Sequence, residues 1–453
     1  MTETDIGTSV RLPFGRDAAG EVGPLIFTGA ITPHDPQTGS IPQNTREVDP
    51  GAAELRFGYM FLDIPGDRAF AQAWQVYSNL SLVLLQHGAD LTRMVRQRVF
   101  VRDLRDVPMI ERVMDHFFDR TRVATTLVQI HDIGVDPGIV LQVEGVAAKP
   151  EAPRPQPFGY EALEQVLNGY PAAVRVADFL FLSAVPGVNP ETGMLPSSVG
   201  ELGEARSEFD LTPYRSPRQH AILAETWFTF SNIRGICQAA ESDLSRILKV
   251  TGWLDFPMRD FDPTRPVRQH YFSDQDSKVA STGLWVGPTT IPGAHLAYDA
   301  VCLTGTSEKQ VRLHPSRIVS YYVGATSGGG LVFTCGEVPI DEETPRAITW
   351  AGQLEDDRRL AGFGRLEELT GIEAQTAYVY DKLQGYLEAY GSSLDRVMYQ
   401  MIYLRDMRLH SPLEVVARST YGTRIPATTT VPIHETSPFF PVADLEIEVV
   451  ASS

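Results

Sequence analysis

The sequence predicts an α+β fold that is repeated three times in one chain. Residues 71–126 and 374–429, compared at a constant offset of 303, are identical at 18 of 56 positions without a gap. A third, more divergent copy lies at an offset of 153, where Trp227 falls on Trp74. Since a repeat of this length marks one folding unit, we expect three tandem units, each with one mixed sheet and two helices.

The elements in the first half of a unit follow from its residue pattern. An apolar, β-branched run at 26–29 predicts a strand, and the turn sequence at 35–39 predicts a reversal into a second strand. Apolar residues recur at helical spacing from Ala73 to Leu84 and predict a helix with one buried face. Gly88 follows at the place where a left-handed residue commonly ends a helix.

The second half of the unit adds one more helix and the rest of the sheet. Partial alternation over 94–101 predicts a strand, and residues 108–118 have the pattern of a helix. Two final strands are expected at 125–130 and 139–146. The complete unit is therefore expected to be a sheet packed against two helices.

The boundaries of the three units are indicated by linker-like segments. Residues 149–158 contain four prolines, a composition typical of an extended spacer, and residues 304–317 are polar. We therefore place the units at 1–150, 165–305 and 316–453.

Composition narrows the class of function. The formal charge of −18 disfavours a nucleic-acid partner, which would need clustered Lys and Arg. No apolar run approaches the ~18–20 residues of a membrane-spanning helix, and the first residues show no signal peptide. With 43% hydrophobic residues the chain can bury real cores. Its three cysteines are too few and too scattered for a disulfide framework or a zinc site. A cytoplasmic protein that binds a small molecule is the expectation.

Several short motifs recur at equivalent places. They are Ala71-Gln72 with Ala374-Gln375, Arg102-Asp103 with Arg405-Asp406, Ala124-Thr125-Thr126 with Ala427-Thr428-Thr429, the turn Asn189-Pro190-Glu191-Thr192-Gly193, and the terminal strand Glu446-Ile447-Glu448. Together they resemble the Rid/YjgF family, the reactive intermediate deaminases. Members are short chains that form homotrimers with ligand clefts between subunits, so the resemblance implies a single-chain pseudo-trimer with a chorismate-mutase-like fold, and leaves further association of whole chains open.

The family resemblance also implies an activity: hydrolysis of reactive imines and enamines to a 2-oxo acid and ammonia, without a metal or other cofactor. A family arginine pairs with the substrate carboxylate, and a glutamate of the last strand positions the attacking water. The arginine is replaced in every copy, by Thr125, Ser281 and Thr428. The glutamate survives once, as Glu446, because the first and second units carry Gln142 and Ala297 at its position.

Two further family positions belong to the same implied site. The tyrosine position holds Tyr322 in the third unit, Tyr170 in the second and, more loosely, Phe14 in the first. The Ser/Thr position is assigned to Thr28, Ser183 and Cys335. The third unit alone combines the tyrosine with the glutamate, so its site is the best candidate for chemistry, with Thr428 or Cys335 binding the polar end of the substrate.

Other candidates have a functional and a structural interpretation. To act as a nucleophile, Cys335 would need a neighbouring base, and His434 is the candidate that its position suggests. In the structural interpretation Cys335 is a packed thiol. His434 and His131 would then each cap a loop. Arg122 lies three residues before Thr125 and Arg424 four residues before Thr428, and either is a candidate substitute for the lost arginine. Glu446 itself could be a solvent-facing strand residue.

Three functions stay open on this basis. The first is a hydrolase or deaminase that uses Glu446 to position water for attack on a C=N or enamine bond. The second is a lyase or hydrolase on a cyclic acid, as in the chorismatases. The third is a small-molecule-binding protein without turnover, which the loss of three arginines favours.

Overall fold

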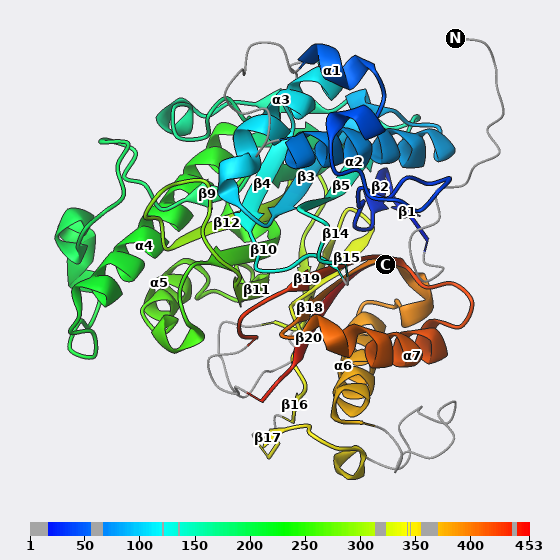
Figure 1. Cartoon of the computed structure of the whole chain (residues 1–453). Coiled ribbons are helices and arrows are strands. Elements are labelled where there is room, and N and C mark those ends of the chain that lie inside the picture. The colour runs from blue at the N-terminus through cyan, green and yellow to red at the C-terminus, as the bar shows by residue number, and fades with distance from the viewer. Residues whose placement is uncertain are drawn as a thin grey trace.

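The computed structural model describes residues 17–55, 67–119, 122–134, 136–312, 323–341, 343–344, 346–354, 370–436 and 442–453. It contains three sheets of similar topology, each with two main helices on one side (Figure 1). The α+β class and the three tandem units expected from the repeat are confirmed. None of the helices in the described part of the chain combines the length and hydropathy that a membrane crossing requires.

The first sheet has the strand order β1-β2-β5-β3-β4. Its strands are β1 (Ala19–Val22), β2 (Leu25–Thr28), β3 (Met94–Val101), β4 (Ala124–Gln129) and β5 (Leu141–Ala148), and its helices are α1 (Gly51–Leu55), α2 (Asp67–Gln86) and α3 (Val107–Phe117). The β3–β4 pair is parallel and the other pairs are antiparallel. The strand expected after the turn at 35–39 is not formed, since the described residues between this turn and α2 contain only the short helices Thr45–Glu47 and Gly51–Leu55.

The second sheet has the order β11-β10-β12-β8-β7-β6, and β9 also pairs with β12. Its strands are β6 (Gln156–Phe158), β7 (Ala173–Val176), β8 (Phe179–Leu182), β9 (Val185–Pro186), β10 (Ile247–Leu254), β11 (Ala280–Trp285) and β12 (Leu296–Leu303), and its helices are α4 (Pro217–Ala239) and α5 (Thr264–Tyr271). Ser216 begins α4 with a capping box to Gln219. The proline-rich segment 149–158 thus contributes β6, the edge strand of this sheet.

The third sheet has the order β13-β14-β15-β20-β18-β19. Its strands are β13 (Gln310–Val311), β14 (Ala325–Gly328), β15 (Leu331–Thr334), β18 (Val397–Leu404), β19 (Ala427–Pro432) and β20 (Leu445–Ser452), and its helices are α6 (Gly371–Glu388) and α7 (His410–Tyr421). A small hairpin of β16 (Ile340–Asp341) and β17 (Arg346–Ala347) stands apart from the sheet.

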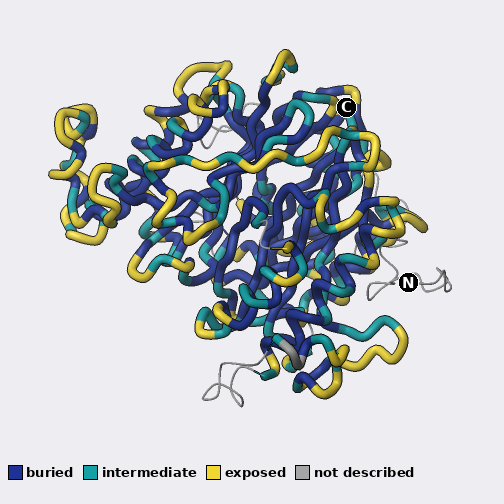
Figure 2. The backbone as a smooth tube through the Cα atoms, turned by 90° about the horizontal axis from the view of Figure 1, so that it is seen from above, coloured by how far each residue is buried: buried dark blue, intermediate teal, exposed yellow. Residues whose placement is uncertain are grey.

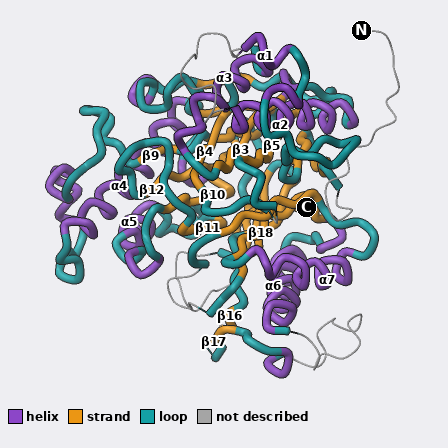
Figure 3. The backbone as a smooth tube through the Cα atoms, in the orientation of Figure 1, coloured by secondary structure: helices purple, strands orange, loops and turns teal. Residues whose placement is uncertain are grey.

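The three sheets face one another and the helices lie outside them (Figure 3). One buried cluster takes side chains from all three sheets, among them Phe27, Phe181 and Phe333. Three separate clusters fill the space between each sheet and its own helices. Figure 2 shows the result as a buried interior with exposed chain at the periphery. The shared cluster makes the three units one body.

The turn after the first long helix differs among the units. Gly88 and Gly391 have φ of 69° and 72°, as predicted for Gly88 from its position beyond the helix. The second unit has Glu241 at the equivalent place, with φ of 59°. A side chain in this region is strained, so the divergent copy keeps the turn at a cost.

Candidate active site at the seam of the second and third units

The central strands of the three units meet at Arg98, Thr251 and Met401, which occupy equivalent positions on β3, β10 and β18. The Arg98 guanidinium lies 3.1 Å from the Thr251 hydroxyl and 3.3 Å from the Met401 sulfur. Three residues that are 153 and 303 positions apart in the repeat therefore touch. This contact marks the centre around which the units are arranged.

Three acidic residues surround this centre, one from the last strand of each unit: Glu144, Asp299 and Glu448. Each accepts a hydrogen bond from a threonine of another unit. The donors are Thr429 to Glu144, Thr126 to Asp299 and Thr282 to Glu448. The threonines follow the lost-arginine positions by one residue, so the repeat places a hydroxyl of each unit on the acid of the next.

A backbone hydrogen bond joins each pair of neighbouring units, at a contact that we call a seam. The amide of Gly336 donates to Ser281 O at 3.3 Å, that of Ala184 to Thr125 O at 3.1 Å, and that of Ala30 to Thr428 O at 3.0 Å. These bonds make Gly29, Ser183 and Cys335 equivalent. The assignment of Thr28 to this position is therefore wrong by one residue.

The actual role of Thr28 is structural. Its hydroxyl accepts from the amide of Gly145 at 2.7 Å, as that of Thr334 accepts from the amide of Val449 at 2.9 Å. The two hydroxyls fasten β2 to β5 and β15 to β20, the last strand of each unit.

Glu446 lies on β20 opposite Tyr403, at the seam between the second and third units. It is 3% exposed, which excludes the solvent-facing interpretation. A Cβ atom added to Gly336 would stand 1.8 Å from Glu446 Oε1 and 2.8 Å from Thr282 Oγ1. The carboxyl group therefore fills the space that the missing side chain of Gly336 leaves, with Thr282 of the second unit beside it.

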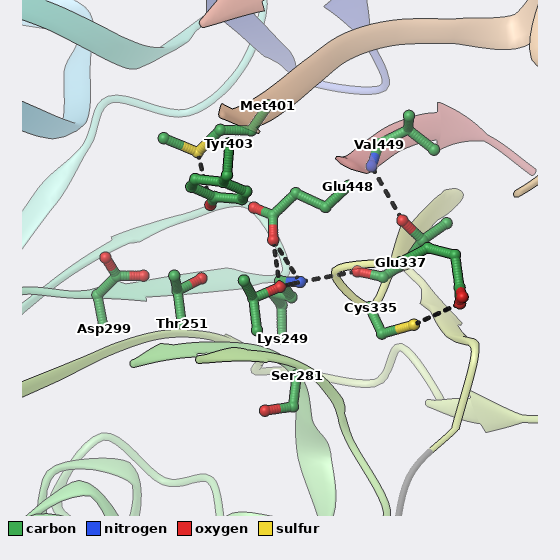
Figure 4. Close-up of polar contacts among 12 residues, drawn as sticks. Lys249, Thr251, Ser281, Asp299, Cys335, Glu337, Met401, Tyr403, Glu448 and Val449 are labelled. Atoms are coloured by element: carbon green, nitrogen blue, oxygen red, sulfur yellow. Dashed lines mark hydrogen bonds and ion pairs between the residues drawn. The ribbon is translucent and has the colours of Figure 1, made fainter. Parts of the chain in front are cut away.

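Lys249 fixes the neighbouring carboxylate at the same seam. Its ammonium lies 2.7 Å from Glu448, 2.7 Å from the Thr282 hydroxyl and 2.8 Å from the Thr334 carbonyl. Figure 4 shows Lys249 of β10 directed at Glu448 of β20. The lysine satisfies its three donors and joins the second unit to the third.

The two glutamates of β20 have opposite pKa shifts. Burial raises the pKa of Glu446 well above its ordinary value, and the negative charge of Glu448 adds to this effect. Burial acts on Glu448 as well, but the charges of Lys249 and Arg98 prevail and lower the pKa of Glu448. Neighbouring carboxyl groups with divergent pKa values are the arrangement that acid–base chemistry uses.

Cys335 is also at this seam, as a buried thiol. Its sulfur lies 3.8 Å from Glu337 Oε2, and Glu337 is held by Lys382 at 2.5 Å and by the Tyr386 hydroxyl at 2.7 Å. Burial, followed by the charge of Glu337, raises the pKa of Cys335 well above its ordinary value. This environment favours the thiol over the thiolate that a nucleophile requires.

His434 is placed with other partners. Its ring stacks on His131 with centroids 4.7 Å apart and lies 4.6 Å from the ring of Trp285. Its amide donates to the carbonyl of Trp285, which lies four residues beyond Ser281 on β11. Among the contacts of the described residues none joins His434 to Cys335, so the structure does not assemble the base and nucleophile expected from position.

Thr428 and Arg424 lie at a different seam, between the third and first units. The Thr428 hydroxyl accepts from Gln400 at 2.9 Å and donates to the Pro426 carbonyl at 2.7 Å. Arg424 is 63% exposed and contacts Asp17 at 3.4 Å. The structure thus separates both residues from Glu446. Tyr322 and Phe14 lie outside the described residues.

Arg268 of α5 is a residue that the sequence reasoning missed. Its guanidinium donates to the hydroxyl of Ser281, the serine that replaces the family arginine at the Glu446 seam. The side chain is 1% exposed and lies over the ring of Phe261 at 5.6 Å. It reaches Ser281 from thirteen residues earlier in the chain, a relation that depends on how α5 packs and that no spacing rule indicates.

Comparison with known proteins agrees with the motifs and with the repeat. The family model described as Endoribonuclease L-PSP matches residues 62–149 and 314–453, together half of the chain. A RutC family protein of Pyrococcus abyssi is 25% identical over 129 residues, which cover 28% of this chain and 82% of that protein.

Two solved structures of single-unit proteins are also similar. YyfA of the conserved Rid protein family from Yersinia pestis is 22% identical with a TM-score of 0.25, and the match covers 32% of this chain and 99% of that chain. E. coli TdcF with bound serine is 22% identical with a TM-score of 0.25, and the match covers 31% and 94%. On the extent of the family match, the chain belongs to the endoribonuclease L-PSP family, and the resemblance to the Rid/YjgF group is confirmed.

Proposed function

We propose that this chain is a Rid-like hydrolase of small imines or enamines, in which Glu446 activates water at the seam of the second and third units. The observation that carries this proposal is the state of Glu446: a buried carboxyl group with a raised pKa, next to an ionised carboxylate. A general base works best when its pKa lies near the working pH. Of the three equivalent positions, only this one holds an acid.

The reaction needs only groups that the seam supplies and a water molecule. Ionised Glu446 accepts a proton from water while the water oxygen bonds to the C=N carbon. The protonated carboxyl then gives its proton to nitrogen, which leaves a carbinolamine. Glu446 next takes the proton of the new hydroxyl group and passes it to the same nitrogen while the C–N bond breaks, so ammonia and a carbonyl product leave. Lys249 and Thr282 keep Glu448 ionised and fixed, so the proton is directed to Glu446 rather than shared between the two carboxyl groups.

Arg268 supports a substrate that carries a carboxylate. Its guanidinium reaches the hydroxyl of Ser281, where the family arginine would stand. A guanidinium fork binds a carboxylate through two parallel hydrogen bonds. We propose that Arg268 supplies from a helix the cation that the strand has lost, so the substrate class is 2-imino acids or their enamine tautomers.

The arrangement of units gives this site its place. We propose functional units at 1–150, 165–305 and 316–453 that form a pseudo-trimer, with one competent seam out of three. The formal charge of −18 disfavours RNA as the substrate, in spite of the family description. The product is expected to be a 2-oxo acid.

The proposal is tested by generating 2-imino acids in solution and measuring their removal and the release of ammonia. Glu446→Gln should lower kcat/KM by about 100-fold or more, the usual worth of a general base, while the melting temperature stays close to that of the parent. Gln142→Ala, at the equivalent position of the first unit, is the matched control and should retain turnover. Full activity of Glu446→Gln would contradict the mechanism.

A second variant separates substrate choice from chemistry. Arg268→Met should raise KM for an imine with a carboxylate and leave KM unchanged for an imine without one. Equal effects on both substrates would remove Arg268 from the site.

A binding protein without turnover is the second candidate, favoured by the burial of Glu446 and the inert state of Cys335. In that case no imine is consumed, and a small acid raises the melting temperature through binding to the folded chain.

A further inference from the structure

A pair of buried cysteines lies in the second unit, away from the seam of Glu446. Cys237 is near the end of α4 and Cys302 is on β12, and both are fully buried in the cluster between the second sheet and its helices. A hydrogen bond joins the two thiols, and both are free in the structure. The fold therefore brings together two thiols that are far apart in the sequence.

The repeat shows that packing alone does not require cysteines at these positions. Backbone hydrogen bonds of the turn after the first long helix identify the equivalents of Cys237, and strand register identifies those of Cys302. The equivalents are Leu84 and Ala147 in the first unit and Leu387 and Ala451 in the third. Two copies fill this buried space with a leucine and an alanine, and the second copy has replaced both residues by thiols.

Ser242 contacts both cysteines. Its amide donates to the Cys237 carbonyl at 2.8 Å, and its hydroxyl lies 3.1 Å from the Cys302 sulfur and donates to the Leu303 carbonyl at 2.6 Å. The Cys302 sulfur is also 3.5 Å from the Leu303 carbonyl and 3.6 Å from that of Asp243. These contacts hold the sulfur of Cys302 in one place, beside Cys237.

The two thiols differ in acidity. Burial raises the pKa of Cys302, but its hydrogen bonds, first that from Cys237, and the charge of Arg246 prevail and lower it. The hydrogen bond to Cys302, followed by burial, raises the pKa of Cys237 well above its ordinary value. Since the thiolate is the reactive form, Cys302 is the thiol that reacts first with an oxidant, and Cys237 is placed to react with the product.

Lys309, in the loop after β12, places an amine near the pair. Its Nζ atom is buried and has no hydrogen-bond partner among the described residues. Burial lowers the pKa of Lys309 to about 7, and the negative charge of an ionised Cys302 opposes this effect. A thiolate at Cys302 would therefore supply the counter-charge that the lysine lacks, and the ammonium would stabilise the thiolate in return.

We propose that Cys237 and Cys302 form a reversible disulfide when the chain meets hydrogen peroxide. The Cys302 thiolate, with its proton held by Lys309, attacks one peroxide oxygen; the O–O bond breaks, the departing oxygen takes that proton and leaves as water, and Cys302 becomes a sulfenic acid. Cys237 then bonds to the Cys302 sulfur, and its thiol proton leaves with the hydroxyl group as a second water. Two thiols are oxidised and one peroxide is reduced to two waters.

The bond would tie α4 to β12 inside the second unit. It does not depend on the proposed hydrolase activity, because neither cysteine lies at the seam of Glu446. A thiol reductant reverses it by exchange.

The test treats the full chain with hydrogen peroxide, blocks the remaining thiols in denaturant and maps the peptides by mass spectrometry. A disulfide between Cys237 and Cys302 is expected, and dithiothreitol should remove it. Cys335 is also buried but has no cysteine beside it among the described contacts, so it is the internal control and should remain a thiol. Lys309→Met should slow disulfide formation several-fold.

Two variants test the pairing. In Cys237→Ala, oxidation should stop at a sulfenic acid on Cys302, captured by dimedone added with the denaturant. Cys237→Leu/Cys302→Ala gives the second unit the residues of the other two, and should keep a melting temperature close to that of the parent and form no disulfide.

The proposal fails if peroxide leaves both thiols unchanged, if Cys335 is oxidised as fast as Cys302, or if the sulfurs reach sulfinic acid without a disulfide. Should the double variant not fold, the peptide map of the parent decides.

Discussion

Arg98 of the first unit donates two parallel hydrogen bonds to Asp299 of the second, from Nε to Oδ2 at 2.9 Å and from Nη2 to Oδ1 at 2.8 Å. Both side chains are buried, and breaking such a pair leaves an uncompensated charge that costs about 3–5 kcal/mol. Arg98→Met should lower the free energy of unfolding by that amount in denaturant titrations. The double variant Arg98→Met/Asp299→Asn should recover part of the loss.

The exposed pair of Arg408 and Asp406 is the matched control for this prediction. Its arginine is 91% exposed, and exposed ion pairs contribute little because water and salt screen them. Arg408→Met should leave the free energy of unfolding nearly unchanged. Similar losses of unfolding free energy for Arg98→Met and Arg408→Met would mean that the buried pair of Arg98 and Asp299 does not hold the units together.

Glu446 should make stability depend on pH. Its pKa is raised in the folded chain, so the folded state holds this proton more tightly than the unfolded state does. The resulting stabilisation is complete below the unfolded pKa near 4.5 and is lost as pH rises through the folded pKa. Compared with the parent, Glu446→Gln should therefore become relatively more stable as pH rises in that window. Parallel curves for the two proteins would argue against a raised pKa.

Gly336→Ala should displace Glu446 without a new charge. The added methyl group would meet Glu446 Oε1 at 1.8 Å, and overpacking of this kind costs about 1–3 kcal/mol. Imine turnover should fall as in Glu446→Gln. Gly385 of α6, where an added Cβ meets nothing within 4 Å, is the control, and Gly385→Ala should stabilise by roughly 0.5–1 kcal/mol.

Cys335 should be inert toward alkylation in the folded protein. The thiol is 3% exposed and its pKa is raised by burial, so little thiolate is available. Site-resolved mass spectrometry after iodoacetamide treatment should find Cys335 unmodified until denaturant is added. Cys335→Ser should retain imine turnover; a loss of turnover with an intact fold would restore a chemical role for the thiol.

Glu241→Gly should stabilise the second unit. Glu241 adopts φ of 59° where the other units have glycine. The left-handed region costs a non-glycine residue about 1–2 kcal/mol, part of which glycine gives back in unfolded-state entropy. A gain of roughly 0.5–1 kcal/mol in the free energy of unfolding is expected, and Gly88→Ala should have the opposite effect. No gain would mean that the Glu241 side chain stabilises its turn.

The fold could be predicted because its signals are local and repeated. The partial alternation predicted β3 with its observed bounds, Met94–Val101, and the position of Gly88 predicted its left-handed φ. The strand expected after the turn at 35–39 was wrong, because the described residues that follow the turn form the short helices Thr45–Glu47 and Gly51–Leu55 instead.

The site was harder to predict because it is built across units. Position along one unit indicated His434 as a partner of Cys335, but the histidine contacts the other two units instead, through His131 and Trp285. Thr428 was expected near Glu446 because both belong to the third unit, whereas the seam of Glu446 uses Ser281 of the second. A repeat reveals equivalent positions, and it does not say which copy faces which.

The asymmetry at Arg98, Thr251 and Met401 fixes the stoichiometry of the assembly. Three first units assembled alone would bring three guanidinium groups to within contact of one another, since Arg98 touches the other two equivalents directly. Three third units would bury three copies of Glu448 with only Met401 and Tyr399 at the positions that hold cations elsewhere. Identical copies of one unit would thus bring like charges together at the centre, whereas the single chain combines one guanidinium with a hydroxyl and a thioether there.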